Sequence, residues 1–107
     1  MYALHGIKHA FKTEHNTWIH LLLSITAIVL GFVMNIHRLE WLALVIVIAM
    51  VWTAELFNTA IEKIMDFISK ERHPHIKLVK DIAAAAVLVT AVAAFITGCI
   101  VFIPKLF

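Results

Sequence analysis

Three long apolar runs constrain this chain more than any other feature. The runs 18–34, 41–54 and 82–103 contain no Asp, Glu, Lys or Arg. The chain has 107 residues, of which 63% are hydrophobic and only 15% charged, so it cannot cover itself with a polar surface. A helix needs about 20 residues to cross the roughly 30 Å hydrocarbon core of a bilayer. We therefore predict an all-α integral membrane protein with transmembrane helices over about 18–35, 41–60 and 82–103.

Short polar segments separate these runs and favour a single domain over residues 1–107. The turn 35–38 follows the first run, and His73-Pro74 predicts a helix break before the third. The chain has only three glycines and two prolines, which leaves no flexible linker. Residues 1–16 are too polar for a signal peptide, so we expect none. Apolar side chains share one face of residues 3–11, which predicts an amphipathic helix over 1–15 on the membrane surface.

The basic residues predict the orientation of the chain in the membrane. Seven of the nine Lys and Arg residues lie before the first run or between the second and third runs. Cytoplasmic loops carry such an excess of positive charge. We therefore expect a multi-pass protein of a bacterial plasma membrane, with a cytoplasmic N-terminus and an external C-terminus.

A ladder of polar residues follows the second run. Glu55, Asn58, Glu62 and Asp66 lie at helical spacing, which places them on one stripe of a helix. If the span begins near Trp41, it ends near residue 60, so Glu55 lies inside the cytoplasmic boundary. A carboxylate at this depth is costly and needs a partner or a task, such as accepting a proton from a lipid hydroxyl. Glu62, about 10 Å further along, could hold a divalent cation at the water boundary.

A second polar cluster lies at the start of the third run. Lys80-Asp81 precedes the small residues Ala83–Ala86, which allow a neighbouring helix to approach closely. The Lys80 ammonium could neutralise phosphate oxygens, and Asp81 could orient it. Glu14, just before the first run, is a third acid at the same membrane level. No GxxxxGK[ST] phosphate loop is present, so a nucleotide site would need another construction.

These motifs resemble the prokaryotic diacylglycerol kinase family, which includes the undecaprenol kinases. The resemblance covers nearly the whole chain and rests on "ELFNTAIE" (55–62), "ERH" (71–73), "KD" before small residues (80–86) and "KTEHN" (12–16). It implies an enzyme that phosphorylates membrane lipid alcohols with ATP and Mg²⁺. It also implies a homotrimer of three-span subunits, each with a surface helix, that share active sites between them.

The resemblance also implies roles for single residues. Glu55 matches the general base and Asn58 its polar support. Glu14 and Glu62 match the pair that binds the metal of the nucleotide, and Lys80 and Asp81 match the phosphate-binding pair. The remaining nucleotide contacts match Tyr2, Glu71 and His73.

Two departures from the best-known branch of the family bear on the substrate. His20 stands where that branch has an acid, and Ala83–Ala86 lacks its Gly-Ser. Both features resemble the undecaprenol-type branch, so we predict an undecaprenol kinase. A diacylglycerol kinase is the first alternative, and a non-enzymatic subunit of a membrane assembly or a small ion conductor are the others. We expect no nucleic-acid partner.

Overall fold

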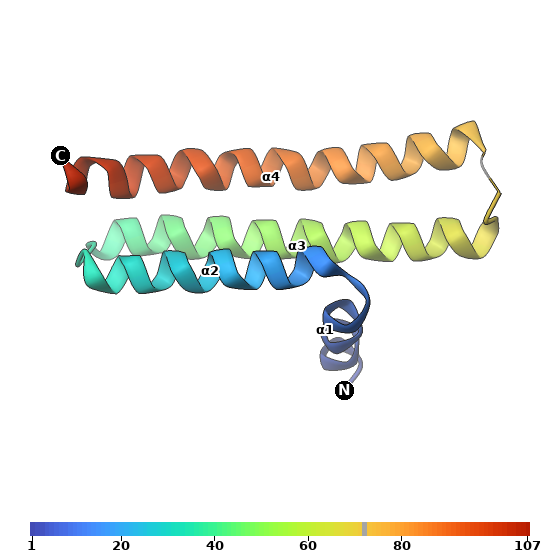
Figure 1. Ribbon diagram of the computed structural model, residues 1–107, viewed down its shortest axis with the longest axis horizontal. Coiled ribbons are helices and arrows are strands. Elements are labelled where there is room, and N and C mark those ends of the chain that lie inside the picture. The colour runs from blue at the N-terminus through green and yellow to red at the C-terminus, as the bar shows by residue number, and fades with distance from the viewer. Residues whose placement is uncertain (72) are drawn as a thin grey trace.

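The computed structural model describes residues 1–71 and 73–107, which form four helices (Figure 1). They are α1 (Tyr2–Thr13), α2 (His15–Val33), α3 (Arg38–Ile68) and α4 (Pro74–Leu106). The last three run alongside one another in a body of 51 × 31 × 19 Å, and α1 turns away from them near the N-terminus. By length and composition α2, α3 and α4 can each cross a membrane. The prediction of an all-helical membrane protein is confirmed at this level.

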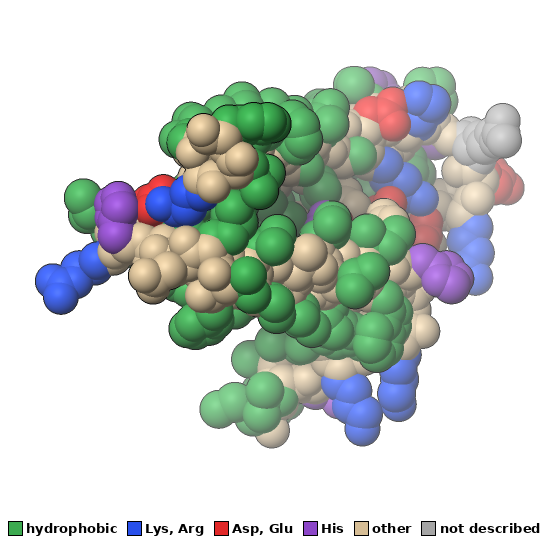
Figure 2. Space-filling view, turned by 60° about the vertical axis from the view of Figure 1, so that its left-hand side comes forward, with side chains coloured by type: hydrophobic (Ala, Val, Ile, Leu, Met, Phe, Trp, Pro, Cys, Tyr) green, Lys and Arg blue, Asp and Glu red, His purple; other side chains and the backbone are tan. Residues whose placement is uncertain are grey.

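α3 is the central element of the bundle. It packs most extensively on α4 and less on α2 and α1. The buried core is small: Ile36, Leu44 and Val101 form one cluster, with Trp41 and Phe102 partly buried against it. Most other large apolar side chains lie on the outside, where they cover much of the surface in Figure 2. Such an extensive apolar exterior is suited to lipid or to further subunits rather than to water.

The tight turn between α2 and α3 depends on Gly31 and Asn35. A Cβ atom added at Gly31 would lie 2.7 Å from the ring of Trp41, so only glycine lets the two helices come this close. Asn35 adopts φ 53°, a left-handed conformation that asparagine tolerates. Glu40 accepts a hydrogen bond from the backbone N–H of His37 at 3.1 Å and lies 3.0 Å from Lys105 Nζ. These contacts tie the start of α3 to the end of α4.

The helices α3 and α4 are longer than the predicted spans. α3 continues past residue 60 to Ile68, because its polar ladder remains helical beyond the apolar run. Pro74 does not interrupt a helix but begins α4, where its missing N–H costs no hydrogen bond. α4 also passes through Pro104 to Leu106. A proline so close to a helix end disturbs only the last turn.

Candidate active site

Glu55 lies on α3 in a buried position close to α2. The residue is 4% exposed, and its Oε2 atom is 3.3 Å from Nε2 of His20. The indole of Trp52 flanks the imidazole, with ring centroids 6.4 Å apart. The Thr59 hydroxyl, one turn further on, donates to the backbone carbonyl of Glu55 at 3.0 Å and not to its carboxylate. Within residues 1–71 and 73–107, His20 is the only basic side chain that forms an ion pair with Glu55.

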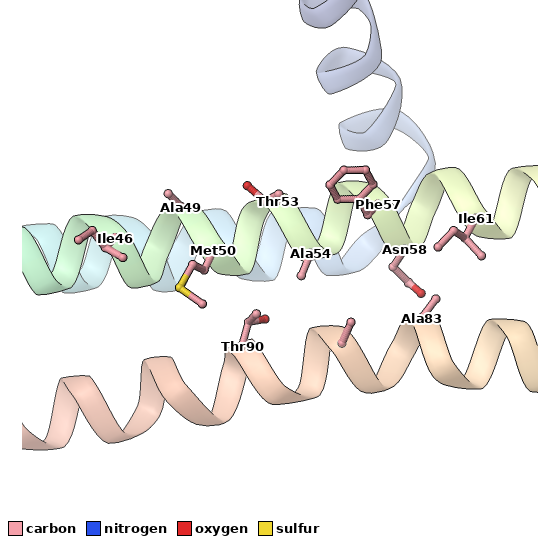
Figure 3. A pocket seen from close by; sticks show the side chains of 11 residues that line it. Ile46, Ala49, Met50, Thr53, Ala54, Phe57, Asn58, Ile61, Ala83 and Thr90 are labelled. Carbon is pink, nitrogen blue, oxygen red and sulfur yellow. The ribbon is translucent and has the colours of Figure 1, made fainter.

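Asn58, one turn beyond Glu55, borders a groove between α3 and α4. The groove has a volume of about 560 Å³, and its lining is largely apolar. Asn58 and Ala83 point toward one another across it, from α3 and α4 respectively (Figure 3). The Oδ1 atom of Asn58 is buried and accepts no hydrogen bond from the described residues. An unsatisfied buried polar atom costs about 1–3 kcal/mol, so a partner from outside the chain is expected at this position.

A polar cavity lies at the ends of α3 and α4 that meet the linker between them. Its volume is about 820 Å³. Five of the nine residues predicted for the site line it: Glu62, Glu71, His73, Lys80 and Asp81. Arg72, which belongs to the motif 71–73, lies outside the described residues. The polar cavity brings together segments that are separated in sequence, and it begins about two helical turns beyond Glu55.

The ion pairs at the polar cavity differ from the predicted pairing. Lys80 Nζ donates to Asp66 Oδ1 at 2.7 Å, whereas Asp81 accepts from Lys77 at 2.6 Å. Lys80 is therefore oriented by an acid on α3 and not by its neighbour Asp81. The hydrogen bond from Lys80 lowers the pKa of Asp66, and the same bond raises the pKa of Lys80. This ion pair connects α3 and α4 at the mouth of the polar cavity.

Glu14 and Glu62 interact electrostatically. Glu14 is the residue between α1 and α2, where the backbone is extended. Glu62 lies beyond the apolar run 41–54 and beyond residue 60, where the predicted span ends. Burial raises the pKa of Glu62, and the negative charge of Glu14 raises it further. The negative charge of Glu14 thus acts on the Glu62 carboxylate, and two neighbouring carboxylates are suited to sharing a cation.

The described residues do not include a complete metal site. No group of three or more His, Cys, Asp or Glu side chains is found close enough together among them to hold an ion. Mg²⁺, however, is commonly bound by one or two carboxylates together with substrate phosphates and water. Glu14 and Glu62 fit that requirement.

Tyr2 lies away from the other predicted site residues. It opens α1, is 98% exposed and does not line the polar cavity. The other end of α1 is anchored, because the Trp18 indole donates to the Phe11 carbonyl at 2.8 Å. The Phe11 ring also packs 5.8 Å from that of Trp52. The structure therefore fixes the end of α1 next to Glu14 and leaves Tyr2 remote from the polar cavity.

In the sequence, His20 is connected only with the choice of substrate and Asp66 only with the polar ladder, so neither ion pair is predicted. A signal for His20 was present: it lies two residues inside Trp18, at the depth predicted for Glu55. A signal for Asp66 was also present, because it continues the stripe of Glu55 and Glu62 on α3. In both cases the partner is on another helix, and one sequence does not give the pairing of helices.

Comparison with known proteins identifies the family. The family model for prokaryotic diacylglycerol kinase matches residues 1–102. An undecaprenol kinase of Bacillus subtilis is 37% identical over 106 residues, which cover 99% of this chain and 86% of the relative. A diacylglycerol kinase of Synechocystis is 33% identical over 98% of this chain and 61% of the relative. A diacylglycerol kinase of Pseudomonas aeruginosa is 33% identical over 90% of this chain and 78% of the relative. The chain belongs to the prokaryotic diacylglycerol kinase family.

Proposed function

We propose that this protein is a lipid kinase that transfers the γ-phosphoryl group of ATP to the hydroxyl group of undecaprenol. The main support is the placement of a buried carboxylate, Glu55, about two helical turns below a polar cavity lined by Lys80 and Glu62. A lipid alcohol at the membrane boundary can reach Glu55, and a nucleotide in water can enter the polar cavity. Relatives named as kinases favour this function over a non-enzymatic subunit or an ion conductor.

In this proposal Glu55 is the general base. Its carboxylate accepts the proton of the acceptor hydroxyl while the oxygen–phosphorus bond forms. General-base catalysis contributes about 10²–10⁴-fold to a rate. Asn58 supports the site with its side-chain amide, which borders the groove and can donate an N–H to the oxygen of the acceptor hydroxyl. Burial makes both interactions stronger than they would be in water.

The polar cavity would hold the triphosphate. Lys80 neutralises negative charge on the transferring group, and Asp81, Glu71 and His73 contact other parts of the nucleotide. Glu14 and Glu62 would hold Mg²⁺, which shields phosphate charge when it is bound. The ion pair between Lys80 and Asp66 keeps the ammonium at the mouth of the polar cavity until phosphate replaces the carboxylate.

The orientation and assembly are part of the same proposal. The polar cavity faces the cytoplasm, where ATP is available, and the C-terminus lies outside. α1 lies on the membrane surface, with basic side chains of Lys8 and Lys12 directed to the head groups. Three subunits associate through their exposed apolar helices into a homotrimer, and they share active sites between them.

The preference for undecaprenol rests on the lining of the groove. A polyprenol brings one hydroxyl and no other polar group, whereas diacylglycerol also brings two esters that need hydrogen-bond donors. On the α4 side the groove beside Asn58 is lined by Ala83, Ala86 and Thr90. An alanine side chain donates no hydrogen bond, and the Thr90 hydroxyl already donates to the Val87 carbonyl at 2.8 Å. We therefore expect undecaprenol to be phosphorylated more efficiently and diacylglycerol to be the poorer substrate.

The test is competition between the two lipids in one mixed micelle with purified protein, Mg²⁺ and radiolabelled ATP. The ratio of kcat/KM is expected to favour undecaprenol by about 10–200-fold, the range available to a largely apolar site. A ratio favouring diacylglycerol would overturn the substrate assignment and leave the kinase assignment standing. Phosphorylation of neither lipid would overturn both.

A further inference from the structure

His20 is a partly buried polar side chain that the mechanism above does not use. Its side chain is 16% exposed and that of Glu55 is 5% exposed, and the two approach to 3.3 Å. We infer that His20 is a positioning residue for Glu55: it fixes one carboxylate oxygen so that the other faces the acceptor hydroxyl. The inference rests on the proposed function, because Glu55 acts there as the general base.

The geometry assigns different tasks to the two oxygen atoms of Glu55. Oε2 is the atom next to Nε2 of His20, so Oε1 remains available for the acceptor. A carboxylate on a free side chain rotates between several orientations, and a misplacement of about 1 Å can cost 10²-fold in rate. A contact with one oxygen removes most of that freedom. His20 thus acts on the base and not directly on the substrate.

The imidazole is itself held in place by neighbouring side chains. The indole of Trp52 lies on one side of it, and the Trp52 Nε1–H donates to the Ser24 hydroxyl at 2.9 Å. Ser24 is one turn beyond His20 on α2, so the hydrogen bond ties α3 to the same helix that carries the imidazole. The Phe11 ring of α1 lies 5.8 Å from the Trp52 ring, measured between centroids. Three helices therefore support one histidine.

Few other charged groups act on Glu55 among the described residues. On α2 the neighbouring titratable group is His20, and on α3 it is Glu62, whose pKa the charge of Glu55 helps to raise. Lys80 of α4 pairs with Asp66, and Lys77 pairs with Asp81, so neither of these cations forms an ion pair with Glu55. Glu14, between α1 and α2, acts on Glu62. Among the described residues, His20 is therefore the one basic side chain within ion-pair distance of Glu55.

Glu55 and His20 both take part in the proton balance of the reaction. The acceptor hydroxyl loses its proton to Oε1 of Glu55 as the new oxygen–phosphorus bond forms and the bond to ADP breaks. His20 Nε2 stays next to Oε2 and holds the carboxylate in place while Oε1 takes up the proton. After the product leaves, the proton passes from Glu55 to water, and the pair returns to its starting state.

The first test compares three substitutions of His20 in the full-length protein in detergent micelles. Glutamine places its side-chain N–H near the position of Nε2, asparagine reaches only about as far as Nδ1, and leucine donates nothing. We expect His20→Leu and His20→Asn to lower kcat about 10–100-fold, with both KM values within about twofold of wild type. His20→Gln should retain most of kcat. His15→Leu is the matched control, because His15 is an exposed histidine on the same helix.

The second test detects the contact between His20 and Glu55 independently of kinase activity. A hydrophobic carbodiimide modifies protonated carboxyl groups in membranes, and mass spectrometry of the peptide that contains residue 55 reports the modification. We expect His20→Leu to increase labelling of Glu55 several-fold and His20→Gln to leave it near the wild-type level. Glu55→Gln gives the background.

The outcomes separate the two proposals. If all three His20 variants match wild type in kcat and labelling, or if His20→Gln is as impaired as His20→Leu, the positioning role is overturned. If wild-type protein phosphorylates no lipid but labelling still depends on His20, the pair stands and the kinase function falls. Unchanged labelling in His20→Leu overturns the pair whether or not the kinase is active.

Discussion

Glu55 and Glu62 carry the same functional group on the same helix but have different surroundings. Glu55 is buried and lies next to His20, whose ring is flanked by Trp52. Glu62 borders the polar cavity, where Glu14 opposes its ionisation and Lys80 favours it. In the proposed function, this difference in environment makes Glu55 the proton acceptor and Glu62 a metal ligand.

Replacement of Glu55 by glutamine tests the base. The amide keeps the shape of the side chain but cannot accept the proton, so Glu55→Gln should lower kcat by about 10²–10⁴-fold. Affinity for Mg·ATP should remain within about twofold of wild type, because the polar cavity is two turns away. Steady-state kinetics and nucleotide binding by fluorescence measure the two effects. Wild-type turnover in this variant would remove Glu55 from the mechanism.

Replacement of the acidic pair tests the metal site. Glu62→Gln and Glu14→Gln should each raise the apparent KM for Mg·ATP about tenfold or more, because each removes one carboxylate from the cation. Excess Mg²⁺ should recover part of the loss in either variant. Titration of activity with Mg²⁺ at fixed ATP provides the measurement, and Glu71→Gln serves as a comparison at the same cavity. Unchanged Mg²⁺ dependence in both variants would show that the pair does not bind the metal.

At the scale of helices, the agreement with sequence analysis is uneven for a physical reason. Apolar runs and turn residues are local signals, and they located α2, the turn after it and the centres of α3 and α4. Beyond the apolar runs the residues are polar, and polar residues can be exposed to water whether or not they are helical. The sequence therefore did not locate these helix ends, and α3 and α4 are longer than the predicted spans. The pairing of Lys80 with Asp66 depends on the register between α3 and α4. That register is set by packing over the whole length of both helices.

The contact between α2 and α3 can be tested at Gly31. A methyl group there would meet the Trp41 ring, so Gly31→Ala should destabilise the protein by about 1–3 kcal/mol. Gly98 is the matched control, because a Cβ at that position meets nothing within 4 Å. Gly98→Ala should be neutral or stabilise α4 by up to about 1 kcal/mol. Unfolding in increasing denaturing detergent measures both variants, and equal stability of the two would contradict the close packing.

The whole molecule buries little of its own apolar surface. Phe32, Phe57 and Phe95 are each more than half exposed, and α2 packs on only part of α3. One thin subunit therefore leaves its long helices open on several sides. A larger assembly would cover part of this surface, in agreement with the proposed homotrimer.

Native mass spectrometry of the protein released from detergent should give a mass of three subunits, each of 12.1 kDa. Within each subunit, Ala86→Phe should fill the groove between α3 and α4 and lower kcat/KM for the lipid acceptor in the mixed-micelle assay. Leu88→Phe, on an exposed part of the same helix, is the comparison. A monomer that is fully active would contradict the trimer.

α3 runs unbroken from Arg38 to Ile68 and carries both Glu55 and Glu62. A continuous helix holds these two carboxylates about 10 Å apart along its axis, so neither can follow a substrate that moves up or down. The acceptor must come to a fixed level by travelling sideways within the leaflet. Its relevant concentration is then a number per unit of membrane area. Adding inert lipid should slow the enzyme at constant bulk amounts of every reactant, because each collision takes place in two dimensions.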